Sequence, residues 1–136
     1  MKLECLKAII ADELQIRGIL EKLDGDMANF DISQFVVAKN EGKIIGCVRI
    51  KVFIDRSLEL ASLAVLPEYQ GQGVGSELIR KILLSKPARP IFLLTSSGNE
   101  KFYKRFGFNI INSDNLLTIS MFSPRNCPSP KRSNRH

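Results

Sequence analysis

The stretch LELASLAVLPEYQGQGVGSELIRKILL, residues 58–84, constrains the fold more than any other part of the chain. It begins with a nearly continuous apolar run, 58–66, that is typical of a central strand buried on both faces. Pro67 ends this run, and three glycines follow within five positions. Apolar residues then recur at helical spacing from about residue 74 to residue 86. The pattern predicts a buried strand, a Gly-rich turn and a helix in direct succession.

The N-terminal part of the chain predicts a strand, a helix and a β-hairpin. Residues 3–10 alternate imperfectly, as in a short strand. Asp12 and Gln15 resemble a capping box, and Gly25 is expected to stop the helix that follows. Two β-rich runs then flank the turn 40–43. In the second run we expect Val48, Ile50, Val52 and Ile54 on one face and Cys47, Arg49, Lys51 and Phe53 on the other.

The C-terminal part predicts a strand over IFLLT, a short helix over 99–106 and two final strands joined by a turn at 112–115. The resulting order is β-α-β-β-β-α-β-α-β-β. A mostly antiparallel first half followed by strand–helix–strand units predicts an α/β protein with a mixed sheet and helices on its faces. We expect one folded domain over residues 1–122 and a flexible basic tail over 123–136.

The composition indicates a cytoplasmic protein. The chain has 136 residues, which favours a single domain. No stretch approaches the roughly 20 apolar residues of a membrane span, and the N-terminus lacks the apolar run of a signal peptide. We therefore expect no membrane partner.

The cysteines and the single histidine argue against a metal site. Cys5, Cys47 and Cys127 are far apart, and His136 is the last residue. No spacing typical of zinc ligands or of a Cys–His nucleophile is present. We expect reduced thiols and no metal ion.

The basic charge is concentrated in the tail. The net charge is +6, and residues 123–136 contain Arg125, Lys131, Arg132 and Arg135 but no acidic residue. Prolines, serines and asparagines there argue against packed structure. The tail has no aromatic residue that could stack on bases, so we do not expect nucleic acid as a partner. A binding role for the tail is the alternative to a solvated one.

A Gly-rich turn that opens a helix is suited to bind an anion. The first N–H groups of a helix lack partners within it, and the helix dipole adds positive charge. Glycines allow close approach of a phosphate, so Gly73 and Gly75 predict a cradle for a phosphate or pyrophosphate. The Walker motif is absent, because no Gly-Lys-Ser/Thr follows. The alternating glycines do not fit the dinucleotide fingerprint either.

The turn resembles the hallmark of the GNAT superfamily of N-acetyltransferases, Arg/Gln-x-x-Gly-x-Gly/Ala. Residues 70–75, QGQGVG, fit this hallmark fully. LASLAVLPEYQ before them is similar to the family's lead-in, and NEKFYKRFGF, residues 99–108, is similar to its second signature. The resemblance covers roughly residues 35–122. It implies the GNAT fold, in which a mixed central β-sheet is flanked by helices and acetyl-coenzyme A binds at a splayed strand and the following Gly-rich loop.

The resemblance also implies which residues hold acetyl-coenzyme A as co-substrate. It places the pantetheine arm along Leu63, Ala64 and Val65, and the N–H of Leu63 or Val65 would face the thioester oxygen. It places the pyrophosphate on the backbone of the turn, with Ser76 nearby. The implied turn residues are Gln70, Gly71, Gln72, Gly73, Val74 and Gly75. The alternative is a tight turn without a ligand.

Two side chains are candidate catalytic groups. Tyr103 matches the tyrosine that many GNAT relatives place beside the coenzyme sulfur, where its phenol could protonate the leaving thiolate. The alternative is a helix tyrosine that only packs beside Phe102 and Phe106. Glu59 is the one acid in the central strand and lies where several relatives keep a glutamate base. Apolar neighbours should raise its pKa; the alternative is an ion pair with Arg49 or Lys51.

The resemblance implies transfer of an acetyl group from acetyl-coenzyme A to a primary amine of a small molecule or peptide. We expect direct attack in a ternary complex, because no cysteine is placed as an acyl carrier. A homodimer is compatible with the family. Arg49 and Lys51 hint at an acidic acceptor such as an amino acid, while peptides, polyamines and aminoglycosides stay open. The alternative function is a non-catalytic acyl-coenzyme A-binding module whose basic tail contacts a partner or nucleic acid.

Overall fold

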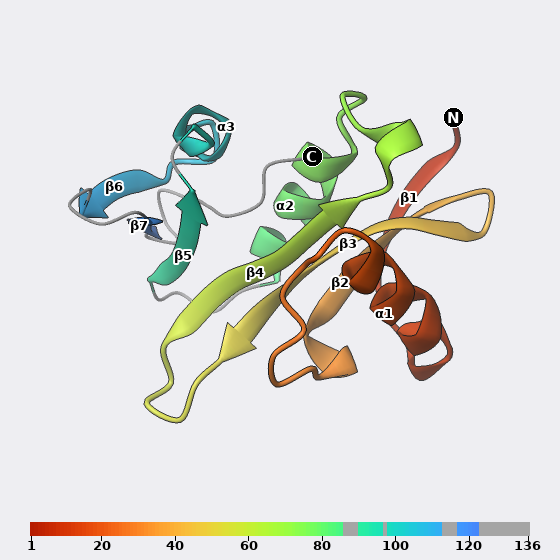
Figure 1. The fold of residues 1–136 in the computed structure, drawn as a ribbon, viewed down its shortest axis with the longest axis horizontal. Helices are drawn as coiled ribbons and strands as arrows, with labels where there is room; N and C mark the ends of the chain where they lie inside the picture. The colour runs from red at the N-terminus through yellow and green to blue at the C-terminus, as the bar shows by residue number, and fades with distance from the viewer. Residues whose placement is uncertain (86–89, 97, 113–116, 123–136) are drawn as a thin grey trace. The chain divides into compact units, whose positions relative to one another are not determined.

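The computed structural model describes residues 1–85, 90–96, 98–112 and 117–122. Its helices and strands follow the predicted order (Figure 1). They are β1 Leu3–Lys7, α1 Glu13–Lys22, β2 Phe35–Asn40, β3 Lys43–Val52, β4 Leu58–Val65, α2 Val74–Leu84, β5 Ile91–Ser96, α3 Glu100–Lys104, β6 Asn109–Asn112 and β7 Leu117–Phe122. Most of the predicted 112–115 turn and the predicted basic tail lie outside the described residues.

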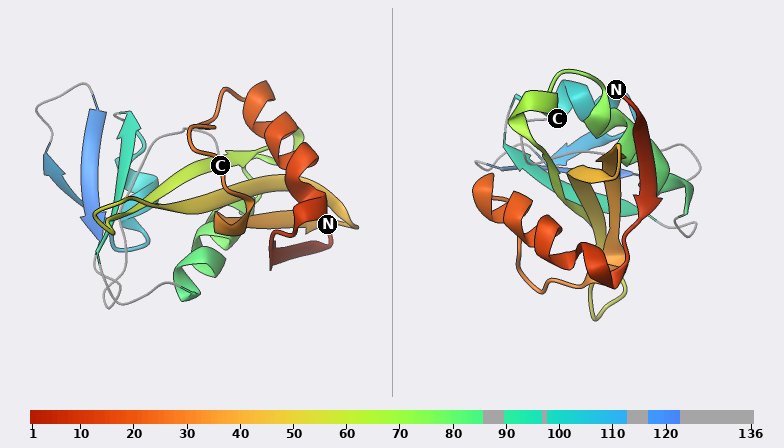
Figure 2. Two further views of the ribbon diagram at one scale, coloured as in Figure 1. Left: turned by 90° about the horizontal axis from the view of Figure 1, so that it is seen from below. Right: turned by 90° about the vertical axis from the view of Figure 1, so that its right-hand side faces the viewer.

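The chain forms two compact units. The first comprises Met1–Arg49 and Ser62–Ile82, and the second comprises Ile50–Ala61 and the described part of 83–134. In the first unit the strands follow the order β1-β2-β3-β4, and both β1–β2 and β2–β3 are antiparallel. Helices α1 and α2 lie on opposite faces of this sheet (Figure 2). Their buried faces follow the predicted helical period, with Ile16, Ile19 and Leu20 in α1 and Leu78, Ile79 and Ile82 in α2.

The second unit contains the mixed pairing that the sequence predicts. The start of β4 pairs in parallel with β5, where Leu58 is opposite Ile91 and Glu59 is opposite Phe92. Strand β7 then pairs antiparallel with both β5 and β6. Parallel and antiparallel pairs in one sheet, with helices against it, confirm the predicted α/β class.

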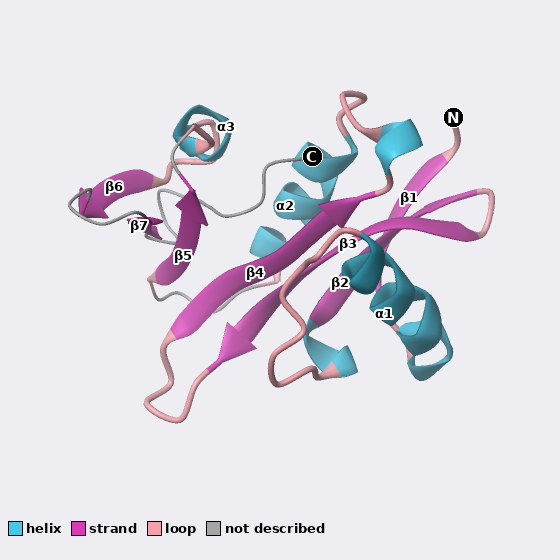
Figure 3. Cartoon of the chain, viewed as in Figure 1, coloured by secondary structure: helices cyan, strands magenta, loops and turns pink. Residues whose placement is uncertain are grey.

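The β2–β3 hairpin also agrees with the sequence. Glu41 and Gly42 both have positive φ, at 52° and 84°. Positive φ at both central residues is the mark of the two-residue turn whose twist matches the flanking strands. Figure 3 shows this turn as the short connection between the two strands.

The predicted capping box at the start of α1 is wrong. The Asp12 side chain makes no cap to α1, because a 3₁₀ turn, Ile10–Asp12, precedes the helix. The carboxylate instead accepts a hydrogen bond from the Ile9 N–H at 2.9 Å. The later helices are shorter than predicted, since α2 ends at Leu84 and α3 covers only Glu100–Lys104.

The predicted faces of β3 differ from the observed ones. All residues from Ile44 to Lys51 are buried, so neither face of this part of the strand is open to solvent. Val52 and Ile54, expected on the apolar face, are exposed because β3 ends at Val52. The structure therefore buries the side chains of Arg49 and Lys51 as well, which are 0% and 8% exposed.

Candidate functional site

The candidate site in the first unit is the end of β4, the turn after it and the start of α2. Leu63, Ala64 and Val65 form the last residues of β4 and are all buried. A 3₁₀ turn, Pro67–Tyr69, leads from β4 toward the glycines (Figure 3). Helix α2 begins at Val74. The structure thus brings together, within one unit, every residue that the sequence predicts to hold the coenzyme.

The glycines at the turn leave the backbone open. Gly71 and Gly73 have φ of +79° and +87°, a conformation that side-chain-bearing residues rarely adopt. A Cβ atom at either position would meet nothing within 4 Å, so the space beside this backbone is free of other protein atoms. The turn therefore has the accessible main chain that a phosphate-binding loop requires.

The start of α2 directs backbone donors toward the turn. The Glu77 N–H bonds to the Gly73 carbonyl at 3.1 Å, which makes Gly73 the residue that caps the helix. Val74, Gly75 and Ser76 form the first helical turn and are buried. N–H groups in the first turn of a helix point out of its end and carry partial positive charge. This arrangement fits the negative charge of a pyrophosphate.

The Gln70 side chain fixes the turn to the strand. Its amide Nε2 donates to the Val65 carbonyl at 2.8 Å. Gln72 Nε2 likewise donates to the Glu68 carbonyl at 3.1 Å. Two glutamines of the predicted motif thus hold the backbone of the turn through their side chains.

Glu59 lies in the second unit, on the part of β4 that pairs with β5. Its side chain is partly exposed, while Leu58 and Leu60 on either side are 1% and 4% exposed. The backbone pair opposite it is Phe92. A carboxylate among apolar strand residues with access to solvent is suited to accept a proton.

Tyr103 also lies in the second unit, in α3, and is 2% exposed. Its ring meets Phe102 edge-on at 4.8 Å between centroids and Phe108 edge-on at 6.1 Å. Edge-to-face contacts at these distances hold an aromatic ring in one orientation. The predicted packing against Phe102 is present, and Phe108 adds a second ring contact. These contacts would also fix the direction of the phenol oxygen.

The described cysteines are poor nucleophiles. Burial raises the pKa of the Cys5 thiol to about 11, and the nearby carboxylate of Glu77 adds to the shift. Burial likewise raises the pKa of Cys47 to about 12. Both thiols stay protonated near neutral pH, whereas the thiolate is the form that attacks a thioester. This supports acetyl transfer without a covalent enzyme intermediate on either residue.

We expect both thiols to resist a thiol-specific reagent in the native protein. At pH 8 a thiol with a pKa of about 11 is only about 0.1% thiolate, compared with about a quarter for an ordinary cysteine. The labelling rate of Cys5 should therefore rise steeply as the pH increases toward 11. Reaction with Ellman's reagent in a Cys127→Ser variant measures this rate, with the urea-unfolded protein as control. Rapid labelling of the native variant at pH 7.5 would contradict the protonated state.

Two features of the first unit could not be found from the sequence. Ser62 in β4 has a φ of +58°, and the fully buried Arg49 donates a hydrogen bond to its hydroxyl. From the sequence alone, Arg49 is an arginine in an apolar strand and a candidate contact for an acidic acceptor. The structure instead uses the guanidinium to bind main-chain carbonyls.

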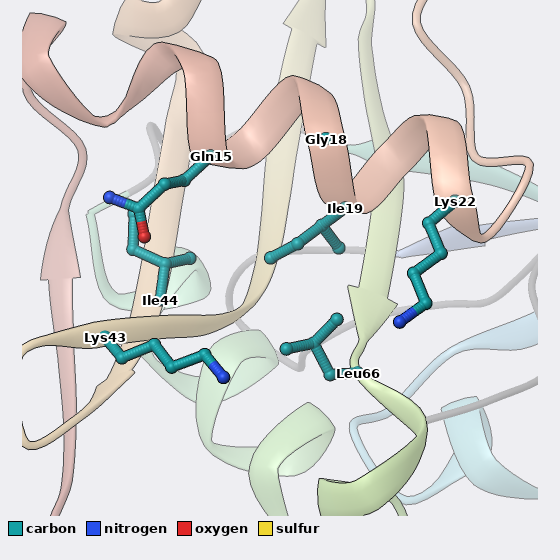
Figure 4. A pocket seen from close by; sticks show the side chains of 7 residues that line it. All are labelled: Gln15, Gly18, Ile19, Lys22, Lys43, Ile44 and Leu66. Carbon is teal, nitrogen blue, oxygen red and sulfur yellow. The ribbon is translucent and has the colours of Figure 1, made fainter.

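A separate pocket of about 230 Å³ lies between α1, the start of β3 and the residue after β4. Ile19, Ile44 and Leu66 line its apolar part. Figure 4 shows Lys22 and Lys43 extending toward it from opposite sides. The predicted coenzyme-binding residues are not among its lining residues, so this pocket is distinct from the Gly-rich turn.

Across the described part of the chain, no group of three or more histidine, cysteine, aspartate or glutamate side chains could hold a metal ion. No described helix is long and apolar enough to cross a bilayer.

The sequence is similar to those of known acetyltransferases. Residues 31–110 match the family described as acetyltransferase (GNAT) domain. An uncharacterized N-acetyltransferase of Chlorobaculum tepidum is 32% identical over 114 residues, which cover 82% of this chain and 72% of that protein. An amino-acid acetyltransferase of Pseudomonas syringae is 36% identical over 107 residues, or 76% of this chain. The match spans only 24% of the length of that relative.

The fold has similar solved structures. A Mycobacterium tuberculosis protein, crystallised in complex with CoA and NLQ, superposes with a TM-score of 0.75 at 18% identity. The match covers 88% of this chain and 98% of that one. The strand, Gly-rich turn and helix described above thus belong to an architecture found in proteins that are named as acetyltransferases or solved with coenzyme A.

Proposed function

The chain is an acyltransferase of the GNAT family, and on this premise we propose that it transfers the acetyl group of acetyl-coenzyme A to a primary amine. The observation that carries the proposal is the open main chain at Gly71 and Gly73 directly before α2. Backbone N–H groups from Gln70 to Gly75, with Ser76 nearby, would bind the pyrophosphate. The pantetheine arm would pair with Leu63, Ala64 and Val65, as an added strand does.

The proposed reaction is direct attack of the amine nitrogen on the thioester carbonyl carbon. A main-chain N–H of Leu63 or Val65 would stabilise the negative oxygen of the tetrahedral intermediate. Glu59 would accept a proton from the attacking amine, and the carbon–sulfur bond would then break. Tyr103 would protonate the leaving thiolate. The high pKa values of Cys5 and Cys47 support a transfer in which neither carries the acetyl group.

We propose an amino acid as the acceptor to test first, because several relatives are named amino-acid acetyltransferases. Arg49 is not proposed to bind the acceptor's carboxylate, since its guanidinium is buried among main-chain carbonyls. Thiol release from acetyl-coenzyme A should be measured with amino acids, polyamines, aminoglycosides and short peptides. Release with amino acids alone would support the proposal, and release with another class would replace the acceptor.

The non-catalytic alternative makes a different prediction. A binding module would bind coenzyme A with no thiol release from any amine. It would also bind a partner or nucleic acid through residues 123–136, and that binding would be lost on deletion of the tail and weakened by salt. Coenzyme A binding together with turnover would exclude this alternative. The cytoplasmic location stays a prediction. The homodimer also stays a prediction, and analytical ultracentrifugation, which measures the mass of the assembly in solution, would test it.

Replacing Gly73 should weaken coenzyme binding without unfolding the protein. In Gly73→Ala the left-handed backbone becomes strained, at a cost of about 1 kcal/mol. We expect the turn to relax and the dissociation constant of coenzyme A to rise about tenfold, because the donors must match the pyrophosphate closely. Isothermal titration calorimetry measures this constant.

Gly42→Ala is the matched control. Gly42 has nearly the same φ, +84°, and a Cβ there would also meet nothing within 4 Å. It lies in the β2–β3 hairpin, so its replacement should cost similar stability and leave coenzyme affinity unchanged. Equal losses of affinity in both variants would show that the effect comes from stability and not from the turn.

A further inference from the structure

The backbone of β4 is left-handed at Ser62. This residue has a φ of +58°, which non-glycine residues seldom adopt within a strand. Before it, buried and partly exposed residues alternate along the strand, and from Ser62 to Val65 every residue is buried. A left-handed residue of this kind re-aims the strand that follows it. The segment it re-aims is Leu63–Val65.

Ser62 is held in this conformation from three directions. Its hydroxyl accepts a hydrogen bond from Arg49 Nε at 2.8 Å and donates one to the Asp26 carbonyl at 2.6 Å. Its own carbonyl accepts from the Cys47 thiol at 3.5 Å. Unfavourable backbone conformations persist where surrounding contacts over-determine them, and these contacts meet that condition.

Arg49 is the centre of this group of contacts. Its side chain is completely buried, and all three guanidinium nitrogens donate hydrogen bonds. Besides Nε, Nη1 donates to the Asn29 carbonyl at 3.1 Å and Nη2 to the Ala28 carbonyl at 2.8 Å. The Asp26 carboxylate lies 3.6 Å from Nη2. A buried cation is tolerated only when it is paired and hydrogen-bonded, so these contacts must form together.

The same guanidinium fixes the connection between α1 and β2. The carbonyls of Asp26, Ala28 and Asn29 all belong to this connection, and the nearby Gln34 side chain accepts from Nη1 at 3.5 Å. Asn29 itself has a φ of +53°. Arg49 therefore joins two left-handed residues, one in the α1–β2 connection and one in β4.

We propose that Arg49 is a positioning residue for acetyl transfer. By holding Ser62 left-handed, it directs the Leu63–Val65 main chain so that an N–H group can face the thioester oxygen. Its hydrogen bonds to the carbonyls of residues 26–29 hold the guanidinium in place for this contact. Arg49 touches neither reactant. This inference rests on the proposed function, because it assigns a purpose to the strand geometry that the reaction would use.

The first test is Arg49→Lys, which keeps the positive charge but removes the planar guanidinium group. A lysine cannot bind Ser62 and the connection at the same time. We expect turnover to fall about tenfold, because a main-chain donor displaced by a fraction of an ångström stabilises the intermediate less well. The KM for acetyl-coenzyme A should rise by less than turnover falls, because the Gly-rich turn proposed to bind the pyrophosphate is untouched and only the contacts along residues 63–65 shift. Turnover is calculated per coenzyme-binding site titrated by calorimetry, so that loss of folded protein does not count as loss of rate.

The second test is rescue by glycine at position 62. Glycine adopts positive φ without strain and therefore does not need the arginine to hold it there. Arg49→Lys with Ser62→Gly should recover at least half of the wild-type turnover, and Ser62→Gly alone should stay within about twofold of wild type. Arg17→Lys is the matched control in the same unit, since Arg17 pairs with Glu13 on α1 at 2.8 Å and is not buried. It should leave turnover unchanged.

The results of these tests distinguish failure of the proposed role of Arg49 from failure of the proposed function. A wild-type protein that binds no coenzyme A and releases no thiol would refute the proposed function. A wild-type enzyme whose Arg49→Lys variant turns over normally per binding site would overturn only the positioning role. The same holds if the fall in turnover occurs but Ser62→Gly gives no recovery, because Arg49 would then act through something other than the conformation of Ser62.

Discussion

Tyr103→Phe is expected to lower turnover about 100-fold, the scale of a well-placed general acid, and to leave coenzyme A affinity unchanged. The substitution removes only the phenol oxygen. The ring is 2% exposed and is held edge-on by Phe102 and Phe108, so phenylalanine can keep the same packing. If the phenol protonates the departing thiolate, its loss affects the step in which the carbon–sulfur bond breaks. Binding of the free coenzyme does not involve that step.

Steady-state thiol release and calorimetric titration with coenzyme A test this expectation. Tyr69→Phe is the matched control, because it also removes one phenol oxygen. Tyr69 lies in the 3₁₀ turn after β4, and its hydroxyl meets the Asn40 side-chain amide at 3.4 Å. We expect that variant to keep wild-type turnover. If Tyr103→Phe turns over as fast as wild type, the tyrosine only packs against its neighbours. The leaving thiolate would then be protonated by solvent.

The parts of the fold that the sequence predicts well are those governed by local period and by turn chemistry. The apolar run of β4, the glycines and the periodic face of α2 lie next to one another in the chain, so no long-range contact is needed to recognise them. The β2–β3 hairpin is similar, because its turn requires positive φ where Gly42 stands. The strand, the glycines and the helix are also the features to which we propose that the coenzyme binds.

Residues whose conformation depends on distant partners could not be predicted. No local signal marks Ser62 as left-handed, since the groups that hold it come from β3 and from the α1–β2 connection. Arg49 is similar: an arginine in a strand suggests a charged face, and only the fold shows main-chain carbonyls surrounding it. At the end of α1 the left-handed residue is Asp24, with φ of 59°, although the adjacent Gly25 is the usual choice.

Glu59→Gln is expected to lower turnover about 100-fold at pH 7, with a loss that shrinks as the pH rises. A general base is needed because an amine is protonated below its own pKa and cannot attack. As the pH approaches the pKa of the acceptor amine, roughly 8 for a peptide N-terminus and above 10 for a lysine, solvent removes that proton without help. The variant and wild-type rates should therefore converge at high pH. Glutamine keeps the size of the side chain on β4, where Leu58 and Leu60 are buried on either side of it.

The pH–rate profile of both enzymes, measured with one acceptor at saturating acetyl-coenzyme A, tests this prediction. Glu68→Gln is the matched control, since Glu68 is exposed in the 3₁₀ turn and should not affect the rate at any pH. Thermal unfolding distinguishes the other role considered for Glu59. If the carboxylate serves an ion pair, the variant should lose stability and keep its turnover. A loss of rate that is the same at every pH would also exclude proton abstraction, because the benefit of a base must disappear once the amine is neutral.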